Sequence, residues 1–170
     1  MRTLGKAYLG VGAFLAVFGA LLVAVMRMTP ARAVEGGALI QPALALVGLT
    51  AIVTLLMVAY RNFAIIRGAV SEHYLRAFTE KPAEWVERPT RTYMNLLELP
   101  LLFYVACLFM LATRKFDALQ VALAWLFVAS RYVHAFIYIG FNYVPLRFAA
   151  YLSGVVTLAV LWTRFAQQAL

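Results

Sequence analysis

Long apolar runs separated by short polar segments dominate the chain. An α-helix needs about 20 mainly apolar residues to cross the hydrocarbon core of a bilayer. Five runs approach or exceed this length, and they lack the strict period-two alternation with regular turns that is typical of a membrane β-barrel. We therefore expect five membrane-spanning helices. They cover approximately residues 7–26, 38–60, 93–113, 118–139 and 145–162.

The connections between the runs differ in character. The second run is expected to continue as a helix past Arg61 and to leave the membrane. The segment 71–89 is polar, with interspersed aromatic residues and two prolines, and is expected to be an irregular segment at the membrane interface. The first run begins with basic residues like a signal peptide, but its apolar part is longer than the usual 7–15 residues. We therefore interpret it as a true span.

Composition supports this interpretation. The chain is 65% hydrophobic and 13% charged, whereas soluble domains are about 45–50% apolar. Too little polar surface is available to cover a water-exposed globule, so we predict an all-α integral membrane protein. The single cysteine, Cys107, excludes an internal disulfide. It lies within an apolar run and is expected to be a packing residue.

Charge predicts the orientation of the chain. The formal net charge is +8, but the basic residues lie mostly near helix ends, where they face lipid headgroups, and we expect no nucleic-acid partner. The connection from Arg61 to Arg91 is the longest and most basic, and basic loops stay in the cytoplasm. With five spans, the N-terminus is then also cytoplasmic and the C-terminus lies on the opposite side.

Polar side chains interrupt the third run. Arg91, Asn95 and Glu98 follow the spacing i, i+4, i+7, which places them on one face of a helix. A charged residue inside a span costs roughly 2.5–3.5 kcal/mol on insertion scales. Such residues are usually retained because they pair, bind or react. This set is therefore a candidate functional site.

A second polar set lies on the last two runs. Arg131, His134 and Tyr138 share one face of the fourth run, and Arg147 and Tyr151 follow at the start of the fifth. In the predicted topology all of these residues lie in the cytoplasmic half of the membrane, together with the set on the third run. Three helices are therefore expected to contribute to one polar site.

The chemistry of these side chains suits a small zwitterionic ligand. Arginine recognises carboxylates through paired hydrogen bonds, and Glu98 can accept an ammonium group. A guanidinium next to a thiol favours the reactive thiolate. Buried polar residues can also simply join helices, and Glu98 and Arg131, at similar depth, are expected to form a structural pair. One histidine near one glutamate is not a metal site.

The residues in these positions resemble those of the MAPEG family, the membrane-associated proteins in eicosanoid and glutathione metabolism. Arg91, Asn95 and Glu98 resemble the Arg-x-x-x-Asn-x-x-Glu signature of its second helix. The resemblance covers about residues 40–165 and is closest to the microsomal prostaglandin E synthase branch. Its second part is carried by Arg131-Tyr132-Val133-His134, Tyr138, Pro145, Arg147 and Tyr151.

The resemblance implies a homotrimer of four-helix protomers, with the cosubstrate glutathione bound between subunits. Residues 37–170 would form the four-helix bundle, and residues 1–36 would form an extra N-terminal helix with its outer loop. Arg147 would be the catalytic residue that stabilises the thiolate. The implied glutathione contacts are Arg91, Asn95, Glu98, His134, Tyr138, Arg147 and Tyr151.

The implied function is that of a glutathione-dependent transferase or lipid-hydroperoxide peroxidase, with a lipophilic electrophile reaching the site from the membrane lipid. The sequence leaves open whether the chain is catalytic. The alternative is a non-catalytic membrane subunit that uses the fold for assembly or lipid binding. It is motivated by the extra first span, which is a candidate docking helix for another membrane protein, and by Phe148, which stands where the prostaglandin synthase branch has a serine.

Overall fold

The computed structural model describes residues 2–70 and 82–170, with side chains from residue 9 onward. These residues form long α-helices joined by short connections, and no strand occurs in the described ranges. Each helix is long and apolar enough to cross a membrane. The protein is therefore an all-helical, multi-pass membrane protein, as predicted. Its helices are α1 (Arg2–Met28), α2 (Gly36–Ile66), α4 (Glu84–Thr113), α5 (Ala118–Gly140) and α6 (Val144–Ala169).

The five predicted spans are confirmed, and most helices extend beyond them. Helix α2 continues past Arg61 to Ile66, as expected. Helix α4 begins at Glu84, so the prediction of an irregular segment was wrong for the part that ends at Pro89. Glu84 and Glu87 lie in the first turn of α4, where acidic side chains stabilise the positive end of a helix. Residues 71–81 of the same prediction lie outside the described residues.

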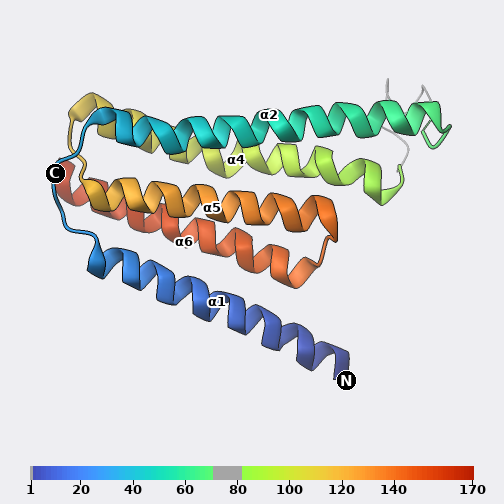
Figure 1. The fold of residues 1–170 in the computed structure, drawn as a ribbon, viewed down its shortest axis with the longest axis horizontal. Coiled ribbons are helices and arrows are strands. Elements are labelled where there is room, and N and C mark those ends of the chain that lie inside the picture. The colour runs from blue at the N-terminus through green and yellow to red at the C-terminus, as the bar shows by residue number, and fades with distance from the viewer. Residues whose placement is uncertain (1, 71–81) are drawn as a thin grey trace.

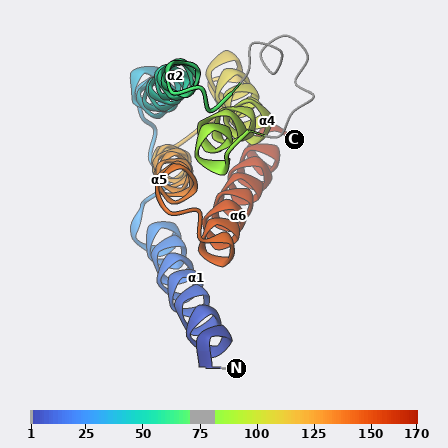
Figure 2. The same cartoon turned by 90° about the vertical axis from the view of Figure 1, so that its right-hand side faces the viewer.

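Helices α5 and α6 lie side by side at the centre of the molecule, between the α2–α4 pair and α1 (Figures 1 and 2). The core between α4 and α5 contains Phe103 and Phe127, both fully buried, with ring centroids 4.8 Å apart. Leu46 of α2 and Leu161 of α6 are also fully buried. The four helices α2, α4, α5 and α6 thus form one packed bundle.

Helix α1 joins this bundle through its C-terminal half and diverges from it toward the N-terminus (Figures 1 and 2). Leu22 contributes to the core, whereas Leu9 and Val17 are 74% and 71% exposed. The linker after α1 returns to the bundle, where the backbone N–H of Ala118 donates to the carbonyl of Arg32 over 3.0 Å. Most of the described surface of α1 is therefore available to lipid.

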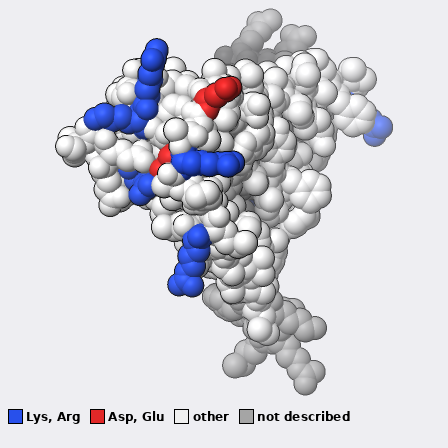
Figure 3. Space-filling model, turned by 60° about the vertical axis from the view of Figure 1, so that its left-hand side comes forward, with Lys and Arg blue, Asp and Glu red and all other residues white. Residues whose placement is uncertain are grey.

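A polar cluster around Asp117 joins the start of α5 to the end of α6. The Asp117 carboxylate accepts from the backbone N–H of Gln120 at 3.2 Å, and the Gln120 side chain accepts from the Asp117 N–H at 2.8 Å, which forms a capping box. Arg164 and Gln168 of α6 donate to the same carboxylate at 2.8 and 2.9 Å. Basic side chains gather on this end of the molecule (Figure 3).

The ion pair between Asp117 and Arg164 predicts a stability that depends on pH. Burial raises the pKa of the Asp117 carboxyl, but the hydrogen bonds from Arg164 and Gln120 and the charge of Arg164 outweigh burial and hold the pKa below its ordinary value of 3.8. The stabilisation is therefore complete above pH 3.8 and is lost as pH falls through the lower folded value.

We expect Asp117→Asn to reduce the free energy of unfolding by about 1–3 kcal/mol at pH 7, because the charged hydrogen bonds are lost while asparagine still caps the helix. Thermal unfolding of both proteins from pH 7 to pH 3 measures the effect. The difference between the two melting temperatures should be constant above pH 3.8 and should narrow as pH falls below that value. A difference that stays constant down to pH 3 would contradict the assignment.

Candidate functional site

Arg147 lies in the first turn of α6, directly after the turn that follows α5. Its guanidinium carbon is 4.0 Å from the centroid of the Tyr138 ring, a cation–π contact. Its Nη1 donates to the side-chain oxygen of Asn142. Arg147 is half-buried, so the guanidinium is held on two sides while part of it stays accessible.

His134 connects Tyr138 to Tyr151 across the α5–α6 interface. The His134 ring centroid is 5.8 Å from that of Tyr138 and 5.8 Å from that of Tyr151. His134 and Tyr138 are buried, and Tyr151 is half-buried. The predicted residues of α5 and α6 therefore do meet, and they form a continuous aromatic row that ends at Arg147.

Arg131 lies next to the Tyr151 end of this row and is 1% exposed. Its Nη2 donates to the backbone carbonyls of Ala150 and Tyr151, both at 3.0 Å, and its Nε donates to Ser130 at 3.3 Å. Its guanidinium carbon is 5.2 Å from the centroid of the Tyr151 ring. Arg131 thus joins α5 to the backbone of α6 at Ala150 and Tyr151.

The expected pair between Glu98 and Arg131 requires correction. Arg131 points to α6, while Glu98 is exposed on α4 and has no ion pair within residues 2–70 and 82–170. The physical reason is that the α6 carbonyls are within reach of the guanidinium and satisfy two hydrogen bonds inside the protein. Within the described residues no basic side chain therefore occupies the Glu98 carboxylate.

Of the predicted site residues on α4, only Arg91 lies near the residues of α5 and α6. Arg91 Nε donates to Glu87 at 3.0 Å, and its guanidinium lies within electrostatic range of the Tyr138 hydroxyl. Asn95 donates to the Arg91 carbonyl at 3.0 Å and follows it along the helix. Arg91 thus belongs to the same cluster as the α5 and α6 residues. Asn95 and Glu98 extend the cluster along the outer side of α4.

Sequence reasoning did not identify three further members of the cluster: Glu84, Arg88 and Asn142. Arg88 donates to Glu84 through Nε at 3.2 Å and Nη2 at 3.1 Å, and to the Gly140 carbonyl at 3.0 Å. Asn142 donates to the same Glu84 oxygen. One signal was available: an asparagine in the short turn between two helices is a typical left-handed residue, and Asn142 has φ +47°.

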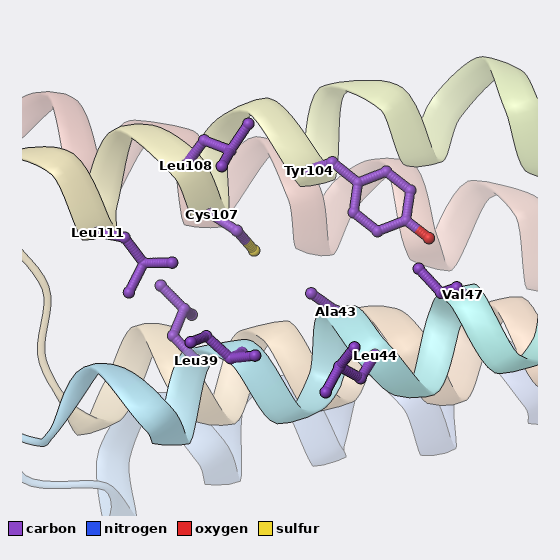
Figure 4. Close-up of a pocket in the computed structure, with 9 residues that line it drawn as sticks. Leu39, Ala43, Leu44, Val47, Tyr104, Cys107, Leu108 and Leu111 are labelled. Atoms are coloured by element: carbon purple, nitrogen blue, oxygen red, sulfur yellow. The ribbon is translucent and has the colours of Figure 1, made fainter.

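An apolar groove between α2 and α4 lies away from this cluster, toward the end of α4 (Figure 4). Its volume is about 310 Å³. The Cys107 thiol points into the space between the two helices and is buried, in agreement with the expected packing role. None of the predicted site residues lines this groove. The lining residues are Leu39, Ile40, Ala43, Leu44, Val47, Tyr104, Cys107, Leu108 and Leu111.

The geometry thus defines a cationic site at the end of the bundle where α5 turns into α6. Arg91 and Arg147 offer guanidinium groups to anions; Arg147 lies over the Tyr138 ring, and Arg91 lies within electrostatic range of the Tyr138 hydroxyl. Glu98 offers a carboxylate for an ammonium group. The arrangement suits a ligand that carries both signs of charge and that places an anionic or acidic atom near Arg147.

Comparison with known proteins supports the family resemblance. A family model described as "MAPEG family" matches residues 39–166, which include all predicted site residues but not α1. No curated protein and no solved structure matches the chain. Since the family model covers well over half of the 170 residues, this chain is a member of the MAPEG family.

Proposed function

We propose that the protein is a glutathione-dependent membrane enzyme, either a transferase that acts on a lipophilic electrophile or a lipid-hydroperoxide peroxidase. The observation that carries this proposal is that the Arg147 guanidinium is held by uncharged neighbours. Within the described residues its hydrogen-bond partner is the neutral Asn142, and its cation–π partner is Tyr138. Its positive charge is thus directed at a half-open site and is available to stabilise a thiolate.

The remaining side chains fit the rest of glutathione. The tripeptide carries two carboxylates and one ammonium group. Arg91, whose side chain is 63% exposed, is placed to bind a carboxylate, and Glu98 is placed to bind the ammonium group. Asn95 lies between them on the same helix face, and Tyr138 offers its hydroxyl beside Arg147. His134 and Tyr151 line the inner side of the site.

The outer face of α4 supports a homotrimer. Glu98 is exposed within a membrane-spanning helix and has no partner in the described part of the protomer. A charged residue facing lipid costs roughly 2.5–3.5 kcal/mol on insertion scales. A neighbouring copy that covers this face removes the cost and completes the glutathione site between subunits. The arrangement agrees with the trimer that the resemblance implies.

The two reactions share one first step, in which the thiol loses its proton and Arg147 stabilises the resulting thiolate. In a transfer reaction the sulfur forms a bond to an electrophilic carbon. In an addition the thiol proton passes to the product, and in a substitution the bond to the leaving group breaks and that group departs as an anion, chloride in the case of 1-chloro-2,4-dinitrobenzene, while the thiol proton goes to solvent. In a peroxidase reaction the sulfur attacks the hydroperoxide, an alcohol leaves, and a second glutathione yields glutathione disulfide and water. The electrophile or hydroperoxide enters from the membrane lipid.

Two observations favour the alternative of a non-catalytic subunit. Phe148, the neighbour of Arg147, is 61% exposed and apolar where the prostaglandin synthase branch has a serine. Helix α1 lies outside the family match and leaves most of its surface to lipid or to another membrane protein. This alternative predicts a protein that does not bind glutathione.

The deciding experiment is calorimetric titration of the purified protein in detergent with glutathione, followed by assays of conjugation to 1-chloro-2,4-dinitrobenzene and reduction of cumene hydroperoxide. We expect saturable binding and at least one activity. Arg91→Ala should raise the dissociation constant about 10- to 100-fold, the equivalent of a charged hydrogen bond worth about 1.5–3 kcal/mol. Arg114→Ala, at the opposite end of α4, is the matched control and should leave binding unchanged. Absence of glutathione binding by the intact oligomer rejects the proposal.

A further inference from the structure

The turn between α5 and α6 contains a chain of hydrogen bonds that ends at Arg147. Arg88 donates to Glu84, Glu84 accepts from Asn142, and Asn142 accepts from Arg147. The chain joins the first turns of α4 to the first turn of α6 through Asn142, which belongs to neither helix. The orientation of the Arg147 guanidinium thus depends on two side chains that lie outside the predicted glutathione contacts.

The direction of each hydrogen bond in this chain is fixed by chemistry. A carboxylate only accepts and a guanidinium only donates. The Asn142 amide nitrogen must therefore face Glu84, and its oxygen must face Arg147. The amide of Asn142 carries both a donor and an acceptor, so it can bridge Glu84 and Arg147 at the same time.

The charges along this chain of hydrogen bonds determine how much positive charge Arg147 can offer to a substrate. The Glu84 carboxylate is paired with Arg88 through two hydrogen bonds, so the two charges largely offset each other. Within the described residues the hydrogen-bond partner of Arg147 is the neutral amide of Asn142, its ring contact is Tyr138, and the Glu84 carboxylate acts on it only at longer range through charge. A carboxylate in the place of the amide would hold the guanidinium as firmly, but it would cancel the charge that a thiolate needs.

We infer that Asn142 is a positioning residue, a neutral spacer that fixes Arg147 through Glu84 while it leaves the positive charge of Arg147 available to the substrate thiol. The inference rests on the proposed function for the role of that charge. The backbone also restricts the choice of residue at this position, because φ is +47° and asparagine adopts this conformation more readily than most other residues.

Two substitutions separate position from charge. Asn142→Asp keeps a hydrogen-bond acceptor for Arg147 and places a negative charge beside it. Because a carboxylate cannot donate, it also loses the hydrogen bond to Glu84, and Glu84→Gln in the same protein restores a donor at that contact. Asn142→Gly keeps the positive φ at no steric cost and removes the bridge. Arg114→Gly is the matched control, because Arg114 is the other described non-glycine residue with positive φ and lies at the opposite end of the bundle.

The main measurement is the titration of protein-bound glutathione, followed by the ultraviolet absorbance of the thiolate. In Asn142→Asp we expect the midpoint to rise by about one pH unit, a tenfold loss of thiolate at fixed pH, while the dissociation constant changes less than about threefold. In Asn142→Gly we expect kcat to fall about tenfold with a smaller shift of the midpoint. Arg114→Gly should match the wild type. A purely structural Asn142 predicts that Asn142→Asp keeps the wild-type midpoint, and this result would overturn the inference.

A second measurement needs no ligand. The NMR signal of the Arg147 guanidinium, assigned by its loss in Arg147→Lys, reports rotation about the guanidinium bonds in the free protein. We expect restricted rotation in the wild type and in Asn142→Asp, and free rotation in Asn142→Gly. If the wild type binds no glutathione, the proposed function fails, but restricted rotation that depends on Asn142 still supports the positioning role. Free rotation in the wild type overturns it.

Discussion

Replacing Arg147 by alanine is expected to lower kcat about 100- to 1000-fold, the usual effect of removing one group that stabilises a developing anion. Arg147 is held against Tyr138 at 4.0 Å and by Asn142, so its guanidinium reaches the reacting thiol in one orientation. Alanine leaves the thiol without this charge. Because Arg91 and Glu98 remain in place to bind the rest of glutathione, the dissociation constant should rise far less than kcat falls.

The comparison of kcat with binding distinguishes this role from simple loss of structure. Calorimetry should show that Arg147→Ala still binds glutathione, and thermal unfolding should show a melting temperature close to that of the wild type. Arg147→Lys keeps the charge but loses the planar contact with Tyr138 and should retain an intermediate activity. Full activity in Arg147→Ala would remove Arg147 from the mechanism.

Replacing Gly154 by alanine is expected to destabilise the protein by about 2–4 kcal/mol, because the interior is overpacked and the hydrogen bonds of a buried charge are disturbed. A Cβ at this position would overlap Arg131 Nη2 and would lie 2.7 Å from both Arg131 Cζ and Ser130 Oγ. The guanidinium then moves away from the Ala150 and Tyr151 carbonyls. For a chain of this length the melting temperature should fall by about 4–16 °C.

Two further variants make this prediction specific. Gly48→Ala, in α2, meets open space and should be neutral or stabilising by up to about 1 kcal/mol. In the double variant Gly154→Ala with Arg131→Met, the shorter side chain removes the overlap. The double variant should therefore be more stable than the sum of the two single changes predicts. Strictly additive effects would show that Gly154 is not needed to accommodate Arg131.

The five helices could be predicted from this sequence because an apolar run long enough to cross a membrane has few stable structures other than a helix. The shared faces of Arg91 with Asn95 and of His134 with Tyr138 also followed from spacing alone. The partner of Arg131 could not be predicted, since spacing gives the face of a helix but not which neighbouring helix covers it. The acceptors of Arg131 are backbone carbonyls of α6, which leave no mark in the sequence.

The bridge through Asn142 escaped prediction for a different reason. Glu84 and Asn142 are separated by 58 positions, and their meeting depends on α4 beginning at Glu84. The polar and proline-containing character of the segment before Tyr93 concealed that start. The orientation of the protein in the membrane and the number of subunits stay predictions.

The hydrogen bonds of Arg131 also bear on how the chain enters the membrane during synthesis. Helix α5 alone would carry a guanidinium into lipid at a cost of roughly 2.5–3.5 kcal/mol on insertion scales. The acceptors that offset this cost arrive only with α6, and the two helices are joined by just the residues 141–143. Helices α5 and α6 should therefore leave the translocon together as a hairpin, and a nascent chain truncated before Ala150 should be retained there or degraded.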